Sequence, residues 1–159
     1  HAGGPLPGRK VKGVIPGGMS MPILPVSQLD VPMANEFLRE RKTMLGTGGV
    51  MVLDDTTCMV RVGCVITYFF RDESCGQCTQ CREGTGWLNK IMQRIERGAG
   101  SLADLDILLD VAGKMEGQTI CAFADAAAWP VQGLLRHFRE DFEAHVTHGK
   151  CPFPQSFEL

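Results

Sequence analysis

The sequence predicts an α+β fold, in which a small β-rich unit is followed by a helical region and a short tail. Apolar, often β-branched runs separated by glycine and proline turns occupy residues 11–53, which is typical of short strands. Further along the chain, apolar residues recur at helical spacing and glycines end the periodic stretches. We therefore expect a sheet-containing domain at residues 1–56, a helical bundle at residues 57–147 and an irregular tail at residues 148–159.

The first domain contains three candidate strands and one candidate helix. Residues 11–15, 21–26 and 49–53 are short apolar runs with glycine or proline turns between them. Residues 33–42 follow a proline and have helical spacing, and proline is favourable at the start of a helix. A sheet with one helix in about 45 residues suggests a β-grasp arrangement. No group of polar residues in the sequence defines a ligand, so we expect a structural or docking role for this domain.

Three amphipathic helices are predicted in the second domain. The first opens at residues 81–83, runs through Trp87 and is stopped by Gly98, and the second opens at Ser101, which forms an N-cap signal with Asp104. The third begins at residues 129–130, a Trp-Pro pair, because proline is tolerated in the first turn of a helix. Their apolar stripes are expected to form the core: Trp87, Leu88, Ile91, Met92, Ile95, Leu102, Leu105, Leu108, Leu109, Ala112, Met115, Val131, Leu134, Leu135, Phe138 and Phe142.

Four cysteines carry the most specific signal in the chain. Cys75, Cys78 and Cys81 have C-x2-C-x2-C spacing, and Cys121 lies in a distant segment. Three thiolates from one loop and a fourth from elsewhere are the usual ligands of a 4Fe-4S cluster. Each two-residue gap lets a tight turn aim successive sulfurs at different corners of one cube, whereas the fourth corner needs a second segment. We therefore predict these four cysteines as cluster ligands.

Zinc binding and disulfide bonding are the alternative roles for these thiols. Structural zinc accepts four cysteines, but its usual pattern is two separated C-x2-4-C pairs rather than a run of three plus one. The chain has 7 cysteines, an odd number, and its composition is not that of a small disulfide-rich protein. We therefore expect a cluster and a reducing compartment.

The remaining thiols and the histidines near the end of the chain are weaker candidates. Cys58 and Cys64 lie in apolar or turn surroundings and are expected to be inert, buried or half-buried thiols. His145, His148 and Cys151 could suggest a second metal site. The glycine and prolines around them predict an irregular tail, however, so we do not expect a metal there.

Charge and hydropathy argue against two classes of function. The formal net charge of -2 provides no basic face for nucleic acid. The longest apolar stretch, residues 60–70, contains Arg61 and is too short to span a bilayer. No Ser-His-Asp or Cys-His pair, paired-carboxylate site or phosphate loop rises above chance. We therefore expect neither nucleic-acid binding nor direct insertion into a membrane.

Three segments around the cysteines are similar to a known family. They are residues 73–87, the run Thr-Ile-Cys-Ala-Phe-Ala-Asp-Ala-Ala-Ala-Trp-Pro-Val-Gln-Gly at residues 119–133, and Arg-His-Phe-Arg at residues 136–139. Together they resemble the C-terminal part of the flavoprotein subunit (the F subunit) of respiratory NADH:quinone oxidoreductase, complex I, and of the diaphorase subunits of NAD-linked hydrogenases and formate dehydrogenases. The composition of residues 59–71 is ambiguous between strand and helix, and the resemblance implies a helix there and hence a four-helix bundle.

The resemblance has further implications for cofactors, partners and location. It implies a 4Fe-4S cluster in the bundle and a soluble-ligand-binding β-grasp domain before it. FMN and NADH bind to an N-terminal domain in that family, and the G-x-G-x-x-G pattern is absent from this sequence. We therefore expect a fragment or split gene product that does not oxidise NADH alone. The implied partners are a thioredoxin-like 2Fe-2S subunit and a large iron-sulfur subunit, on the cytoplasmic side of the inner membrane, or the matrix side in mitochondria.

The resulting hypothesis is an electron-transfer module that would pass single electrons from flavin through the 4Fe-4S cluster to downstream iron-sulfur subunits. The alternative is a non-redox scaffold or assembly module stapled by zinc or a cluster. Arg82 directly follows the third ligand at the start of a predicted helix, so its charge could raise the potential of an anionic cluster. Alternatively, Arg82 pairs with Glu73 or Glu83 at the surface.

Overall fold

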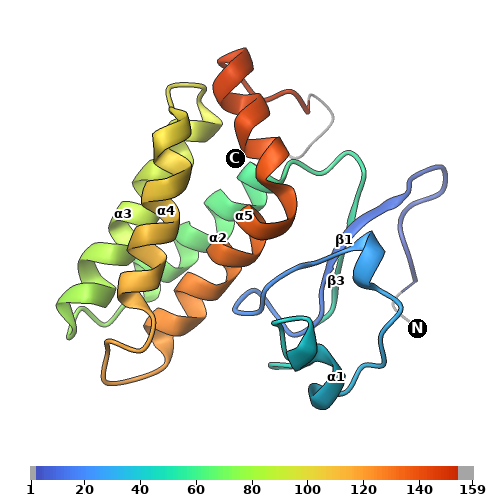
Figure 1. The fold of residues 1–159 in the computed structure, drawn as a ribbon, viewed down its shortest axis with the longest axis horizontal. Coiled ribbons are helices and arrows are strands. Elements are labelled where there is room, and N and C mark those ends of the chain that lie inside the picture. Colours follow the sequence, from blue (N-terminus) through green and yellow to red (C-terminus); the bar gives the residue numbers. More distant parts are fainter. Residues whose placement is uncertain (1–2, 154–159) are drawn as a thin grey trace.

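A computed structural model describes residues 3–153, and its four long helices pack beside a small sheet. Figure 1 shows this arrangement. This arrangement confirms the α+β class. The sheet has three antiparallel strands in the order β2-β1-β3. The elements of this first unit are β1 (Val11–Ile15), β2 (Leu24–Pro25), the 3-10 helix η1 (Val26–Gln28), α1 (Asn35–Glu40) and β3 (Met51–Asp54).

The second predicted strand is much shorter than residues 21–26. Only Leu24 and Pro25 pair with β1, and η1 begins directly afterwards. Pro22 and Pro25 have no backbone N–H, so they cannot donate to a strand ladder, and proline is confined to sheet edges. The predicted helix and the other two strands are confirmed within two residues. The β-grasp description of this unit stays a prediction.

The bundle consists of α2 (Met59–Glu73), α3 (Thr79–Glu96), α4 (Leu102–Met115) and α5 (Phe123–His148). Residues 59–71, ambiguous by composition, are helical, and the burial of Met59, Gly63, Ile66 and Phe70 at helical spacing shows why. The start of α4 is the predicted capping box of serine and aspartate at residues 101 and 104. The helical character predicted for this region therefore agrees with the described residues, whereas its description as an iron-sulfur bundle stays a prediction.

The last helix starts earlier than predicted. It begins at Phe123 rather than at residue 129, so Pro130 lies inside α5 instead of in its first turn. Four alanines at positions 124 and 126–128 explain the early start, because alanine has the highest helix propensity. The helix is interrupted at Phe138, whose φ of -134° and ψ of 28° are not helical.

Most of the predicted stripe residues form the core, but three do not. Trp87, Leu102 and Leu109 are 53%, 55% and 37% exposed. Neighbouring residues on a helix point about 100° apart. Because Leu88 is fully buried, Trp87 beside it lies at the edge of the packed face, where it lines a hollow between α3 and α4. The remaining stripe residues are buried.

The sheet and the bundle share one hydrophobic core. Ile15 and Ile23 of the first unit belong to the same buried cluster as the helices. A Cβ added to Gly133 of α5 would lie 2.8 Å from Pro22, so glycine allows this close approach. Figure 1 shows the sheet beside α5. The division into domains at residues 1–56 and 57–147, with a tail from residue 148, stays a prediction.

Candidate metal centre

The structure places all four predicted ligand cysteines around one hollow of about 200 Å³. Cys81 is buried, Cys78 is half-buried, and Cys75 and Cys121 are exposed. The hollow is also lined by Glu73, Thr119 and Phe123. The distant cysteine therefore reaches the same place as the three-cysteine loop, as the spacing predicts.

The loop between α2 and α3 carries three of these thiols on a short, hydrogen-bonded turn. Gly76 has a φ of +77°, which a residue with a side chain rarely adopts, and its N–H donates to the Ser74 hydroxyl at 3.4 Å. The same hydroxyl lies 3.4 Å from the Cys81 Sγ. Cys78 is the N-cap of α3, so Cys81 lies in the first helical turn, close to the unsatisfied N–H groups of that terminus.

The segment that carries Cys121 is tied to α5 where it leaves α4. The Gly117 N–H donates to the Asp125 carboxylate at 2.8 Å. At the end of α4, the Glu116 carboxylate accepts bonds from Trp129 and Gln132 of α5, at 2.8 and 2.9 Å. The bonds from Gln132 and Trp129 hold the pKa of Glu116 below its ordinary value. The start of the segment is therefore fixed against α5, although Cys121 itself is exposed.

The electrostatics of the hollow favour a cationic occupant. Burial raises the pKa of the Cys81 thiol, the Ser74 hydrogen bond opposes this, and charge repulsion from Cys121, Cys75 and Cys78 raises the pKa further. Four thiolates in one place therefore repel each other unless positive charge lies between them. Iron or another thiophilic metal supplies that charge, so the donor set fits a 4Fe-4S cluster.

Arg82 lies beside this loop and makes two polar contacts. Its Nε pairs with the Glu83 carboxylate at 3.0 Å, and its Nη1 donates to the Gly76 carbonyl oxygen at 2.7 Å. About half of the side chain is exposed. Of the two surface partners considered from sequence, Glu83 is the one in contact, and the contact with Gly76 was not predicted. A role of Arg82 in tuning a cluster stays a prediction.

Cys58 and Cys64 are buried as predicted, but Cys58 has unexpected neighbours. Burial raises the pKa of both Cys58 and Cys64 to about 12. Cys58, His145 and Cys151 lie together, with all three ligand atoms within 4.8 Å of one another. Sequence reasoning placed the last two in a possible site with His148 instead. No local spacing links Cys58 to the others, because they are 87 and 93 positions away.

Comparisons with known proteins identify an iron-sulfur binding region that contains the four cysteines. The family model for the NADH-ubiquinone oxidoreductase-F iron-sulfur binding region matches residues 63–145, a little over half of the chain. The second F subunit (F 2) of the NADH-quinone oxidoreductase of Rhizobium meliloti is 50% identical over 153 residues, which are 96% of this chain and 36% of that protein. The corresponding F subunit of Mycobacterium bovis is 46% identical over 96% of this chain and 34% of its own length.

A solved structure shows the same fold. One chain in the crystal structure of an NAD+-reducing [NiFe]-hydrogenase in the H2-reduced state superimposes with a TM-score of 0.77 at 33% identity. The match covers 86% of this chain and 23% of that one. The present chain spans about a third of the length of the two bacterial F subunits. Among the described residues, none of the helices is both long and apolar enough to cross a membrane.

Proposed function

Because the chain belongs to the family of the NADH-ubiquinone oxidoreductase-F iron-sulfur binding region, we propose that Cys75, Cys78, Cys81 and Cys121 bind a 4Fe-4S cluster. The observation that carries this proposal is that thiols from two distant segments line one hollow. The chain then acts as the electron-transfer part of the F subunit of an NADH-quinone oxidoreductase. When bound, the cluster supplies one-electron redox chemistry.

The residues of the chain bind and shield such a group. The turn at residues 74–78 and the first turn of α3 present three sulfurs, and the anchored segment after α4 presents the fourth. Phe123 lines the hollow and packs edge-on against buried Phe70, with ring centroids 5.3 Å apart, so one side is apolar. The exposed Cys75 and Cys121 mark the side that faces outward. An outward-facing ligand shortens the path to a partner protein.

The wider setting of this module follows from its relatives and is part of the proposal. FMN and NADH bind elsewhere in the parent protein, so this chain alone does not oxidise NADH. The partners are a thioredoxin-like 2Fe-2S subunit and a large iron-sulfur subunit, in an assembly peripheral to the membrane on its cytoplasmic or matrix side. The first 56 residues form a β-grasp-like docking unit, which their shared core with the bundle supports.

Spectroscopy of the anaerobically purified chain tests the proposal. A 4Fe-4S protein is brown, absorbs broadly near 400 nm, is bleached by dithionite and contains about four iron and four sulfide per chain. The reduced protein should then give an EPR signal. A colourless protein with zinc bound by the four cysteines would contradict electron transfer and support the scaffold alternative. NADH-dependent reduction of ferricyanide by the pure chain would contradict the proposed absence of flavin chemistry.

A further inference from the structure

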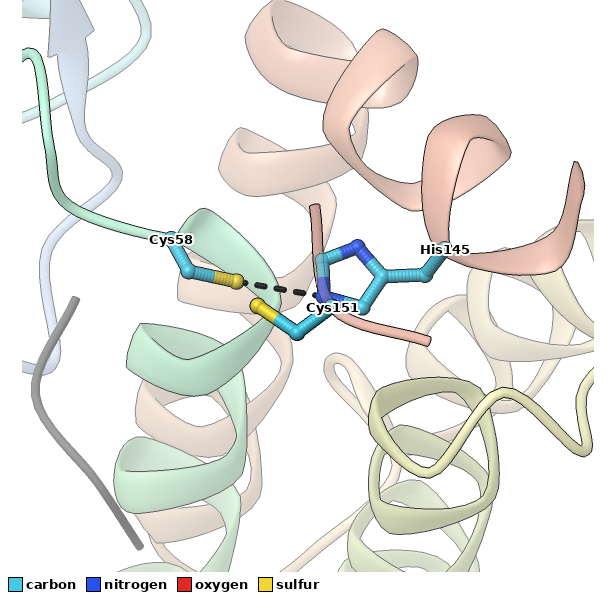
Figure 2. A group of neighbouring side chains, drawn as sticks. All are labelled: Cys58, His145 and Cys151. Atoms are coloured by element: carbon cyan, nitrogen blue, oxygen red, sulfur yellow. Dashed lines mark hydrogen bonds between the residues drawn. The ribbon is translucent and has the colours of Figure 1, made fainter. Parts of the chain in front are cut away.

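A second group of metal-binding side chains lies at the other end of α2 from the four-cysteine hollow. Cys58 precedes α2, His145 lies in the last turn of α5, and Cys151 follows that helix. Figure 2 shows the two sulfurs and the imidazole ring facing one another. The 15 residues of α2 separate this group from Cys75 by about 22 Å along the helix axis, at 1.5 Å per residue.

The spacing of the three ligand atoms is close to that of a tetrahedral metal site. The Cys58 Sγ lies 3.3 Å from the His145 Nε2, and all three ligand atoms lie within 4.8 Å of one another. Zinc bonds of about 2.3 Å to sulfur and about 2.05 Å to nitrogen place these ligands about 3.5 Å apart, and two sulfurs about 3.8 Å apart. Small side-chain adjustments therefore suffice to bind a metal ion.

The imidazole is already oriented as a metal ligand. Its Nδ1 lies 2.7 Å from the backbone oxygen of Asp141. A carbonyl oxygen can only accept, so Nδ1 carries the proton and donates it. In a neutral ring the lone pair of Nε2 then points toward Cys58. A hydrogen bond from the other ring nitrogen to a backbone oxygen is the usual outer contact of a metal-bound histidine.

The thiol of Cys58 also has a favourable setting for binding a cation. Cys58 is the N-cap of α2, and its Sγ accepts the Arg61 backbone N–H at 3.4 Å. Helix N-termini stabilise thiolates. Two thiolates and one neutral imidazole around a divalent ion have no net charge, so the filled site is compatible with burial. Because Cys58 and His145 are both completely buried, substrate cannot reach them, which excludes a nucleophilic Cys-His pair.

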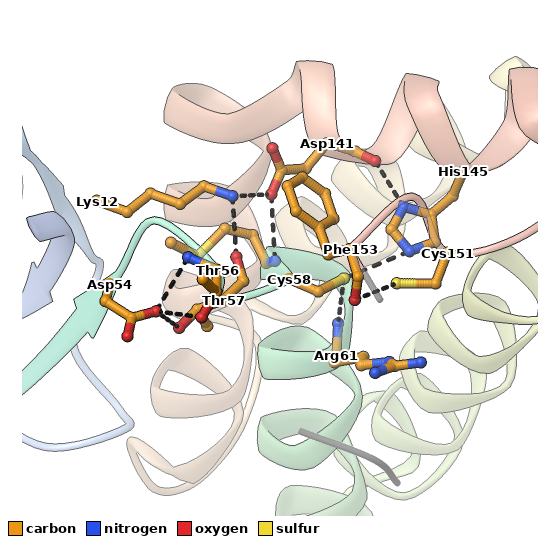
Figure 3. Close-up of polar contacts among 11 residues, drawn as sticks. Lys12, Asp54, Thr56, Thr57, Cys58, Arg61, Asp141, His145, Cys151 and Phe153 are labelled. Carbon is orange, nitrogen blue, oxygen red and sulfur yellow. Dashed lines mark hydrogen bonds and ion pairs between the residues drawn. The ribbon is translucent and has the colours of Figure 1, made fainter. Parts of the chain in front are cut away.

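Aromatic and charged groups close the open side of the group. Phe153 stacks on His145 with ring centroids 6.3 Å apart, and the Lys12 ammonium lies 4.1 Å above the Phe153 ring. Figure 3 shows how Lys12 reaches across to Asp141, which it pairs with at 2.6 Å. The sheet, α5 and the segment after α5 therefore converge on this group.

We propose that Cys58, His145 and Cys151 bind one Zn2+ ion, which staples the segment after α5 to the start of α2. Two sulfurs and one imidazole nitrogen suit zinc, and a water molecule completes four-coordination. Three protein ligands plus water are the usual set of a catalytic zinc site. The complete burial of Cys58 and His145 keeps substrate away, however, so this ion is structural and holds together the three segments that supply its ligands. The proposal is independent of the proposed function, since the two groups share no ligand.

Elemental analysis and zinc-edge X-ray absorption test this proposal on the full chain. The protein is purified anaerobically with its iron cluster intact and treated with a mild chelator to remove loosely bound metal. We expect about one zinc per chain beside the iron, with about two sulfurs at 2.3 Å and one nitrogen at 2.0–2.1 Å in the zinc shell. Cys151→Ala should lose the zinc and keep its iron. Cys64→Ala, which removes another buried thiol of α2, should keep both.

Several results would overturn the proposal. These are a wild-type chain that keeps its iron but holds no zinc after the chelator, a zinc shell of four sulfurs, and unchanged zinc in Cys151→Ala. A disulfide between Cys58 and Cys151 in the anaerobic protein, detected by peptide mass mapping, would also overturn it. Iron content reports whether each variant is folded, and the absorption spectrum of the wild type decides the ligand set without any variant.

Discussion

The two ends of the helical bundle present cysteines in opposite ways. At one end, three thiols come from a single turn, a fourth joins them, and two of the four are exposed. At the other end, three segments contribute one ligand each, and two of the three side chains are fully buried. An outward-facing site suits exchange of electrons with a partner, whereas a buried site suits a structural role. The position of the thiols thus distinguishes two uses of the same side chain.

The largest expected effect is the loss of iron from one end of the bundle while zinc stays bound at the other. Of the four proposed ligands, only Cys121 comes from outside the loop at residues 74–81, so Cys121→Ala should lose the cluster or leave it incomplete. Iron and sulfide should fall well below about four per chain, and the reduced EPR spectrum should disappear. Zinc at the other end of α2 should remain.

The reciprocal variants provide the controls for this prediction. Cys58→Ala and Cys64→Ala should both keep the iron, since neither residue lines the hollow. If Cys121→Ala still contained four iron and four sulfide with an unchanged spectrum, the assignment of the fourth ligand would be wrong. Loss of iron in Cys64→Ala would show that iron content reflects the packing of the bundle rather than its ligands.

The comparison also explains which site could be predicted from sequence. Cys75, Cys78 and Cys81 are close in sequence, and a local turn is enough to bring them together. Cys121 could be added because the cluster chemistry requires a fourth ligand. Cys58 and His145, in contrast, meet only after α2 and α5 pack, and nothing in the local spacing indicates it. Cys58 and His145 come together only through the packing of α2 against α5, so a sequence motif does not reveal their contact.

The fold shows the same division between local and tertiary information. The helical stripes and the serine-aspartate cap at residues 101–104 are local signals, and they predicted α3 and α4 correctly. The predicted start of α5 was wrong because Pro130 was given more weight than the alanines before it. The predicted burial of Trp87 was wrong for a different reason, since periodicity identifies a face but not how much of it a neighbouring helix covers.

The next prediction concerns the ion pair between Lys12 of the sheet and Asp141 of α5. This pair lies at the end of the bundle that carries Cys58 and His145. Lys12 pairs with Asp141 and also donates to the Thr57 backbone oxygen at 2.9 Å. Lys12→Met keeps the aliphatic part of the side chain but removes the ammonium group that pairs with the half-buried Asp141 carboxylate. The free energy of unfolding should fall by about 2 kcal/mol, because hydrogen bonds to charged groups contribute about 1.5–3 kcal/mol.

Chemical denaturation of Lys12→Met and a matched control measures this effect. The control is Lys114→Met, which removes an ion pair with Asp110 between two exposed side chains of α4. An exposed pair of this kind contributes less than about 0.5 kcal/mol. Equal destabilisation in the two variants would show that the pair at the buried end is no stronger than a surface pair.

A smaller effect is expected at the anchor of the Cys121 segment. Glu116→Ala removes the acceptor of the bonds from Trp129 and Gln132, which should cost about 1 kcal/mol or less at this exposed position. The pKa of Glu116 is lowered in the folded state. Its contribution is therefore complete above the ordinary value of 4.5 and is lost as the pH falls through the lower, folded value.

Release of iron to a chelator at neutral pH is the measurement for Glu116→Ala. We expect faster release than in the wild type, because the segment that presents Cys121 loses the bonds that join Glu116 to α5. Asp110→Ala is the control, since it changes another exposed acid of α4, one that pairs with Lys114 of the same helix. Identical release rates for the two variants would mean that the bond from Gly117 to Asp125 is sufficient to fix the segment.

The smallest effect is expected on the midpoint potential of the proposed cluster when the charge of Arg82 is removed. Arg82 contacts the turn that carries the cysteines, but about half of its side chain is exposed to solvent. Reduction makes an anionic cluster more negative, so Arg82→Gln should lower its midpoint potential. A differential interaction of about 1 kcal/mol corresponds to about 40 mV for a one-electron couple. Solvent screening and the pairing with Glu83 should keep the shift at or below that size.

The reciprocal variant, Glu83→Gln, should raise the midpoint potential, because it removes the negative charge that pairs with Arg82. EPR-monitored redox titrations at matched ionic strength compare the wild type with the two variants. If the midpoint potential of Arg82→Gln were unchanged or raised, the hydrogen bonds of the ligand turn, rather than the charge of Arg82, would set the potential.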